Sequence, residues 1–175
     1  MGTLRTRQYR RLGRLRLAGG LHPLGRERQR REDADMTRKG TIVVAGRADG
    51  TALVLGEPLS FWGGIDVETG TIIDHSHPSL GARVTGRILV MPGGRGSSSS
   101  ASVFAESIRR GTGPLGVLLA RADPILTVGA MVAASLYGRD CPIVVCDIAG
   151  IGDGDVVAID ASADGGDGTV AIRPA

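Results

Sequence analysis

Short apolar runs alternate with polar, glycine-containing turns through the first half of this chain. The apolar residues at 41–46 and 52–55 predict two strands joined by a turn at residues 48–50. Further strands are predicted at residues 71–73 and 84–90, the second ending at a buried stretch before Pro92. This half is therefore predicted to form a set of short strands.

The second half alternates helical and strand patterns. Asp123 is a plausible N-cap, and Pro124 suits the first turn of the helix that follows it. The predicted elements are a helix at 101–110, a strand at 116–119, a helix at 125–137, a strand at 142–146, and terminal strands at 156–160 and 169–172 around a turn at 163–168. Strands followed by alternating strands and helices predict an α/β domain, with a small β layer or barrel and two packed helices.

Composition is compatible with one domain built on a Val, Ile, Leu and Ala core. The chain has 175 residues, of which 42% are hydrophobic and only 3% aromatic. No apolar run approaches the roughly 20 residues needed to span a bilayer, so we expect no membrane segment. We expect a cytoplasmic protein.

The basic residues are concentrated in residues 1–35, which hold ten arginines and four acidic residues. The whole chain has a net charge of +3, so residues 36–175 are net negative. We interpret residues 1–35 as a disordered Arg-rich extension, with Met36 as an alternative translation start. An arm for nucleic acid ranks last, because Tyr9 is its only aromatic residue and the remaining domain is acidic.

The two cysteines flank the predicted strand at 142–146. Cys141 and Cys146 are five residues apart, so in a strand their side chains point to opposite faces. This spacing argues against a disulfide and against a shared metal ion. We expect reduced, buried residues that fill the core.

A glycine- and serine-rich run, here called the serine turn (residues 93–100), lies between the apolar segment 88–92 and the predicted helix at 101–110. Glycines there allow a ligand to approach the backbone, and the start of a helix favours anions. The lysine of a Walker loop is missing, and no Gly-x-Ser-x-Gly elbow is present. The alternatives are a helix cap made by one of the serines, or a polar linker.

Three further features have both a structural and a functional interpretation. His75 and His77 beside Asp74 favour hydrogen bonding in a turn over metal binding, because no third ligand is evident. Trp62 and Gly63 either anchor the core or wall a pocket. Asp123 fits a helix cap better than a catalytic acid.

Several ordered motifs together resemble the small subunit of aconitase X, over about residues 40–173. The motifs are Glu57-Pro58-Leu59-Ser60-Phe61-Trp62-Gly63-Gly64, Asp66-x-Glu68-Thr69-Gly70-x-Ile72-Ile73-Asp74, His77-Pro78, Gly86-Arg87-Ile88-Leu89-Val90, Gly94-Arg95-Gly96-Ser97 and Asp123-Pro124-Ile125-Leu126.

The resemblance implies a swivelling β/β/α domain over residues 36–175 that works with a large subunit. Its Gly-x-Gly-Ser turn places the catalytic base at Ser97, supported by Arg95. Substrate binding is expected at Gly96, Ser98, Ser99, Trp62 and Gly63. This chain is expected to hold no metal or cofactor, and the large-subunit partner is expected to carry an iron–sulfur cluster. Such enzymes dehydrate small hydroxy acids, including 5-phosphomevalonate and cis-3-hydroxyproline.

Two departures bear on the substrate. Aconitase proper has an arginine two residues after the base, where this chain has Ser99. The archaeal phosphomevalonate type continues with Thr-Val-Gly-Ser, where this chain has Ser98-Ser99-Ser100-Ala101. We therefore favour hydroxyproline-like or other small hydroxy acids. The alternative function is a non-catalytic, regulatory domain that binds an anion or phosphate.

Overall fold

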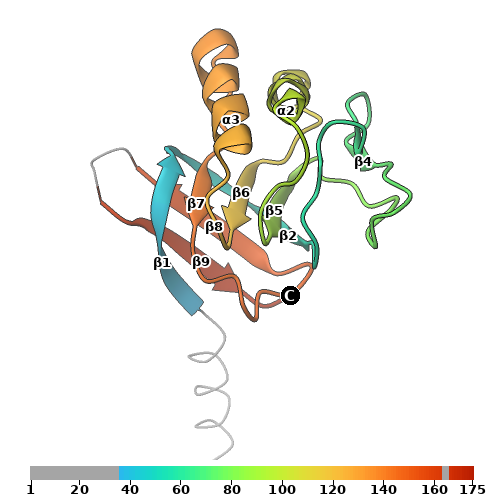
Figure 1. Ribbon diagram of the computed structural model, residues 1–175. Coiled ribbons are helices and arrows are strands. Elements are labelled where there is room, and N and C mark those ends of the chain that lie inside the picture. The colour runs from blue at the N-terminus through green and yellow to red at the C-terminus, as the bar shows by residue number, and fades with distance from the viewer. Residues whose placement is uncertain (1–35, 163–165) are drawn as a thin grey trace, which may run out of the picture.

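Seven strands close into a barrel in the order β1-β7-β6-β5-β2-β8-β9, and two helices lie on one side of it (Figure 1). This computed structural model describes residues 36–162 and 166–175, so the interpretation of residues 1–35 lies outside the described residues. The elements are β1 (Met36–Val44), β2 (Gly46–Val54), β3 (Ile65–Asp66), β4 (Thr71–Ile72), β5 (Arg87–Met91), α2 (Ser99–Arg110), β6 (Gly116–Leu119), α3 (Pro124–Tyr137), β7 (Ile143–Val145), β8 (Val156–Ala161) and β9 (Gly168–Arg173).

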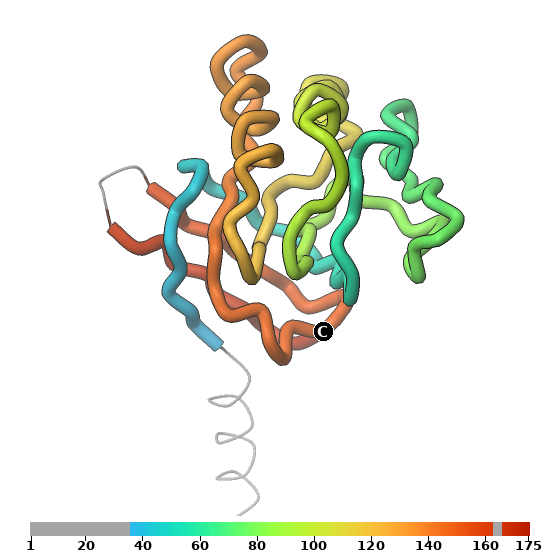
Figure 2. The backbone as a smooth tube through the Cα atoms, viewed as in Figure 1, coloured from blue at the N-terminus to red at the C-terminus, as the bar shows by residue number. Residues whose placement is uncertain are grey.

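The predicted α/β class, with a barrel and two packed helices, is confirmed. The run β5-α2-β6-α3-β7 makes two crossovers, which leave β5, β6 and β7 parallel to one another, and β5 is also parallel to β2. Both helices cover this parallel part of the barrel, as the backbone trace shows (Figure 2). The remaining pairs are antiparallel.

The parallel strands alternate between two cores. On β5, Leu89 and Met91 face the helices, whereas Ile88 and Val90 face the interior of the barrel. The helices contribute Phe104 and other apolar side chains to the first core. Burial on both faces explains why these strands read as continuous apolar runs in the sequence.

The predicted turn at residues 48–50 is wrong, because these residues lie within β2. Ala48, Asp49 and Gly50 pair with β8 in an unbroken antiparallel register. The chain reverses earlier, at Gly46, whose φ of 147° falls in a region that favours glycine. Residues distant in sequence therefore override the local turn signal.

The other predicted strands and helices are confirmed, most of them with shifted ends, and the predicted turn at residues 163–168 lies partly outside the described residues. The strand predicted at 84–90 is β5, which begins at Arg87 because Gly86 turns the chain with a φ of 70°. Helix α2 begins at Ser99, two residues before its predicted start. Helix α3 has the predicted N-cap at Asp123, whose carboxylate accepts the N–H groups of Ile125 and Leu126.

Both cysteines are free and buried, on opposite sides of the sheet as predicted. Cys141 belongs to the core under the helices and Cys146 to the core of the barrel. Burial raises the pKa of the Cys141 thiol to about 12 and also raises that of Cys146. Both are therefore protonated core residues at neutral pH.

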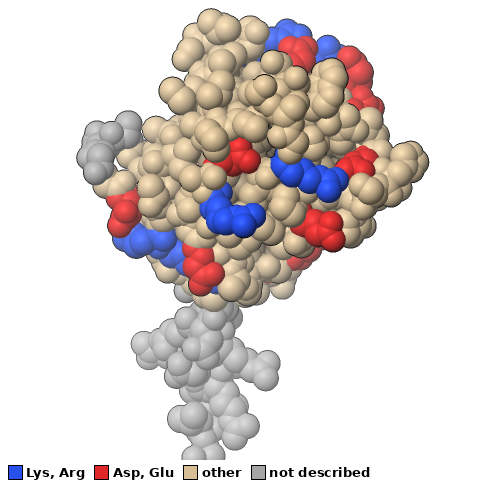
Figure 3. Space-filling model, in the orientation of Figure 1, with Lys and Arg blue, Asp and Glu red and all other residues tan. Residues whose placement is uncertain are grey.

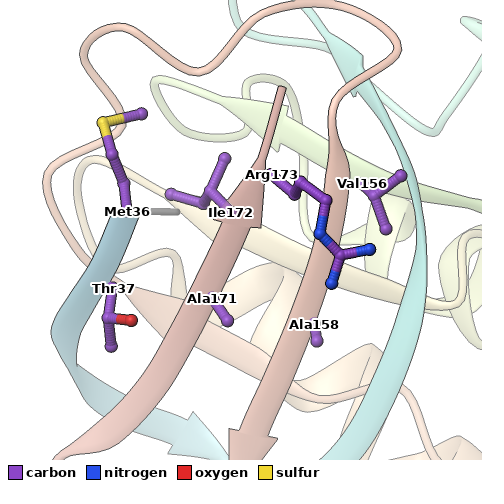
Figure 4. Close-up of a pocket in the computed structure, with 7 residues that line it drawn as sticks. All are labelled: Met36, Thr37, Val156, Ala158, Ala171, Ile172 and Arg173. Carbon is purple, nitrogen blue, oxygen red and sulfur yellow. The ribbon is translucent and has the colours of Figure 1, made fainter. Parts of the chain in front are cut away.

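A hollow of about 130 Å³ lies on the outside of the barrel, between β1, β8 and β9 (Figure 4). Its lining residues are Met36, Thr37, Val156, Ala158, Ala171, Ile172 and Arg173, none of which belongs to the serine turn. None of the helices that the structure describes is long and apolar enough to cross a membrane.

Candidate active site at the serine turn

The serine turn connects the carboxyl end of β5 to the start of α2 and is held from both sides. The Gly94 N–H donates to Asp123 Oδ2 at 2.9 Å. A Cβ at Gly94 would lie 2.3 Å from the same oxygen, so only glycine fits this approach. On the other side, the Arg95 N–H donates to the Leu59 carbonyl at 3.2 Å.

Gly96 turns the chain toward the helix. Its φ is 98°, and a Cβ there would lie 2.5 Å from Ser60 Oγ. Both the backbone conformation and the space require glycine. The turn therefore packs directly against residues 57–64, although about thirty positions separate the two segments in the sequence.

The hydroxyl-bearing residues Ser97, Ser98 and Ser99 are exposed where α2 begins. Among the described residues, the backbone N–H groups of residues 96–99 have no hydrogen-bond acceptor. They lie at the positive end of the helix dipole, where negative charge is stabilised. An oxyanion on a substrate or on a serine side chain would find donors here.

The helix-cap interpretation of the serines is wrong. Ser98 occupies the N-cap position but has helical backbone angles, and its side chain makes no cap hydrogen bond. The tight turn is closed through the backbone instead, by the Ser100 N–H donating to the Ser97 carbonyl at 3.0 Å. The hydroxyls of Ser97 to Ser99 thus remain available.

Ser100 differs from the other three serines and has a structural role. It is buried, and its Oγ accepts the Trp62 N–H at 3.2 Å and lies 3.4 Å from Ser60 Oγ. The sequence did not distinguish Ser100 from its neighbours. The helical period does distinguish it, because Ser100 and Phe104 are four residues apart and lie on the buried face of α2.

The two neighbouring aromatic residues of the loop at residues 57–64, Phe61 and Trp62, differ in burial. Phe61 anchors the core, with its ring centroid 4.6 Å from that of Phe104. The Trp62 side chain is 62% exposed, and Gly63 beside it is exposed with a φ of 71°. Through Ser100, the structure thus brings Trp62 and Gly63 beside the serine turn as an open aromatic rim.

Arg95 is paired with residues of a neighbouring loop. Its guanidinium forms an ion pair with Asp74 and lies 3.5 Å from Ser76 Oγ. Hydrogen bonds from the Ser76 hydroxyl and amide, and then Arg95, hold the pKa of Asp74 below its usual value. No hydrogen bond joins Arg95 to Ser97 among the described residues. Any stabilisation of a Ser97 alkoxide by Arg95 is therefore a longer-range electrostatic effect of a cation that is already paired with Asp74.

His77 is a hydrogen-bonding residue of the neighbouring loop, as predicted. It is buried, its Nδ1 accepts the Ser79 N–H at 3.0 Å, and its Nε2 lies 3.4 Å from the Glu57 carbonyl. His75 is exposed. Among the described residues, no three His, Cys, Asp or Glu side chains gather to hold a metal ion.

Charges of both signs lie near the turn, where Arg95 is paired with Asp74 and the carboxylate of Asp123 accepts the Gly94 N–H. On the face shown in Figure 3, basic and acidic side chains lie next to one another in the region below the helices. The local electrostatics of the serine turn therefore depend on individual side chains and backbone dipoles rather than on a broad patch of one sign.

Barrel, crossover helices and glycine turn together define a swivel-type α/β domain. The model of the aconitase X swivel domain matches residues 37–171, and the chain belongs to this family. The fold is similar to that of aconitase X from Thermococcus kodakaraensis, with a TM-score of 0.69 and 32% identity over 78% of this chain and 98% of that one.

Two groups of curated relatives are similar in sequence. The phosphomevalonate dehydratase small subunit of Methanocella arvoryzae is 36% identical over 73% of this chain and 96% of its own length. The cis-3-hydroxy-L-proline dehydratase of Pseudomonas aeruginosa is 46% identical over 58% of this chain, but over only 17% of its own length. The chain thus spans less than a fifth of the second relative.

Proposed function

We propose that this chain is the small subunit of a heteromeric dehydratase that removes water from a small hydroxy acid. Membership of the aconitase X swivel family supports the reaction class, and the relatives' names include both small subunits and dehydratases. The observation that carries the proposal is the exposed Ser97 just before α2, beside N–H groups that find no acceptor among the described residues.

Ser97 is the general base in this proposal. Removing water across a carbon–carbon bond requires a base for the proton next to a carboxylate. A serine hydroxyl is a poor base until its alkoxide is stabilised, and helix N–H groups and exclusion of water both do this. Residues 96–99 supply the N–H groups, and the paired charge of Arg95 adds a weaker favourable field.

The remaining groups bind substrate. The N–H groups and hydroxyls of Ser98 and Ser99 are placed to receive a carboxylate or phosphate, and Gly96 keeps the backbone open to it. Trp62 and Gly63 form the rim against which the carbon skeleton rests. A small hydroxy acid related to hydroxyproline fits this open, polar site better than a large apolar ligand.

This chain provides half of the proposed active site. Its two cysteines are buried on opposite sides of β7, an arrangement that does not fit an iron–sulfur cluster. We therefore assign the Lewis acid for the departing hydroxide to a large-subunit partner, which would carry the cluster. The partner also closes the site, because Ser97, Ser98 and Ser99 are open to solvent here.

Purification from the native host tests this function. We expect the tagged chain to retain a larger protein containing an iron–sulfur cluster, and the pair to dehydrate a member of a panel of small hydroxy acids. The chain alone is expected to be inactive. Activity of the chain alone would contradict the shared site. Phosphate binding with no retained partner would instead favour a regulatory anion-binding domain.

A further inference from the structure

We propose that Arg121 is a further anion-binding residue of this site, and that it receives a carboxylate or phosphate oxygen pair of the substrate. The identity of the anion as substrate rests on the proposed function, whereas the anion site itself does not. Arg121 was not singled out from the sequence, and none of the motifs discussed above contains it.

Strand register places Arg121 beside the serine turn. β5 and β6 are parallel neighbours, with Met91 opposite Leu119. Two residues further along each chain come Gly93 and Arg121, so both leave the same edge of the barrel. The Arg121 guanidinium lies 3.8 Å from where a Cβ of Gly93 would be. Glycine at this position leaves the guanidinium uncovered by a side chain.

Arg121 is distinguished by the absence of a partner. Within the described part of the chain, its guanidinium has no carboxylate partner and no hydrogen-bond acceptor. Other arginine side chains do have partners, among them Arg38, Arg47, Arg83, Arg87, Arg95, Arg109 and Arg110. Arg139 is likewise unpaired within the described residues, but it follows the far end of α3.

The acid nearest in sequence, Asp123, forms no ion pair with Arg121 within the described residues. The carboxylate of Asp123, two residues away, already accepts the N–H groups of Gly94, Ile125 and Leu126. Arg95, the other cation of the turn, is bound to Asp74. Arg121 is therefore the cation at this edge that is free to bind a new oxyanion, and its planar fork matches carboxylate and phosphate alike.

Amide NMR spectra of the full chain test the anion site without any turnover. Inorganic phosphate and acetate are titrated separately into the wild type, Arg121→Gln, and the control Arg139→Gln. We expect shifts centred on residues 93–99 and an affinity about tenfold weaker in Arg121→Gln, as for loss of a charge-assisted hydrogen bond. Stronger shifts with one anion identify a phosphate or a carboxylate as the preferred group.

The control should match the wild type, and Arg121→Lys should restore part of the affinity. Equal affinities of Arg121→Gln and wild type, or shifts that avoid residues 93–99 at every concentration at which the protein remains folded, would overturn the proposal.

Kinetics of the two-subunit enzyme separate this inference from the function on which it rests. Arg121→Gln should raise KM about tenfold and change kcat much less, since the residue binds rather than reacts. An unchanged KM in an active enzyme would reject Arg121 as a substrate ligand and leave the dehydratase function standing. If the wild-type pair dehydrates no substrate of the panel while Arg121→Gln still weakens phosphate binding, the dehydratase function is rejected and the anion site stands.

Discussion

The carboxylate of Asp123 joins Gly94 to the start of α3. One oxygen accepts the Gly94 N–H at 2.9 Å, and the other accepts the first N–H groups of the helix. A residue recognisable as an ordinary helix cap thus also positions the serine turn. The two crossover connections of the fold are thereby tied together where the candidate site forms.

Replacing Asp123 with alanine should destabilise the domain. Loss of the cap costs about 1 kcal/mol and loss of the Gly94 hydrogen bond about another 1 kcal/mol. The expected fall in the free energy of unfolding, measured by urea denaturation, is therefore about 2 kcal/mol. Asp123→Asn should lose less, and Asp140→Ala, at an exposed position, serves as the control. Equal stability of Asp123→Ala and the control would contradict this dual role.

Gly96→Ala should distort the turn and cost about 1–3 kcal/mol, because a side chain there is both strained at a φ of 98° and too close to Ser60. Gly56→Ala is the matched control, since nothing lies within 4 Å of a Cβ at that position. Thermal unfolding compares the two variants. A Gly96→Ala protein as stable as Gly56→Ala would show that the turn is not held as described.

The pairing of Asp74 with its neighbours should depend on pH. Its pKa is depressed in the folded protein, chiefly by the Ser76 hydroxyl and amide. Such a group stabilises the fold above its unfolded pKa of about 3.9, and this contribution is lost as the pH falls toward the folded value.

We therefore expect the stability advantage of the wild type over Asp74→Asn to be greatest near neutral pH and to shrink below about pH 4. Urea unfolding of both proteins from pH 7 to pH 3 measures it. A difference that grows as the pH falls would reverse the assigned direction of the shift.

The sequence predicts those structural features that depend on residues close together in the chain. The strand at 116–119 agrees with β6, and the cap at Asp123 is as expected, because apolar runs and cap chemistry are local signals. The predicted turn at residues 48–50 is wrong because these residues pair with β8, more than one hundred positions away. No local pattern contains that pairing.

In the candidate site, too, some features are evident from the local sequence and others depend on the fold. The glycines and serines of the turn are evident in the sequence, but their sorting into exposed Ser97 and buried Ser100 depends on contact with residues 57–64. Arg121 reaches Gly93 only because β5 and β6 are adjacent and in register. Such relationships follow from topology, so they emerge only with the structure.

The two thiols should be unreactive in the folded protein. Burial raises the pKa of Cys141 to about 12, so almost no thiolate is present at pH 8. Titration with a thiol-reactive disulfide reagent should detect essentially no thiol in the native protein and two in denaturant, the number in the chain. Rapid native reaction at Cys141 would place it outside the core.

The central claim is that Ser97 supplies the base of a shared dehydratase site. The most direct measurement is kcat of the two-subunit enzyme carrying Ser97→Ala, compared with that of Ser102→Ala, which changes an exposed serine in the first turn of α2. We expect Ser97→Ala to assemble normally and to lose a hundredfold or more in kcat, as for removal of a general base. The control should retain full activity. Turnover by Ser97→Ala within a few-fold of the control would contradict the account.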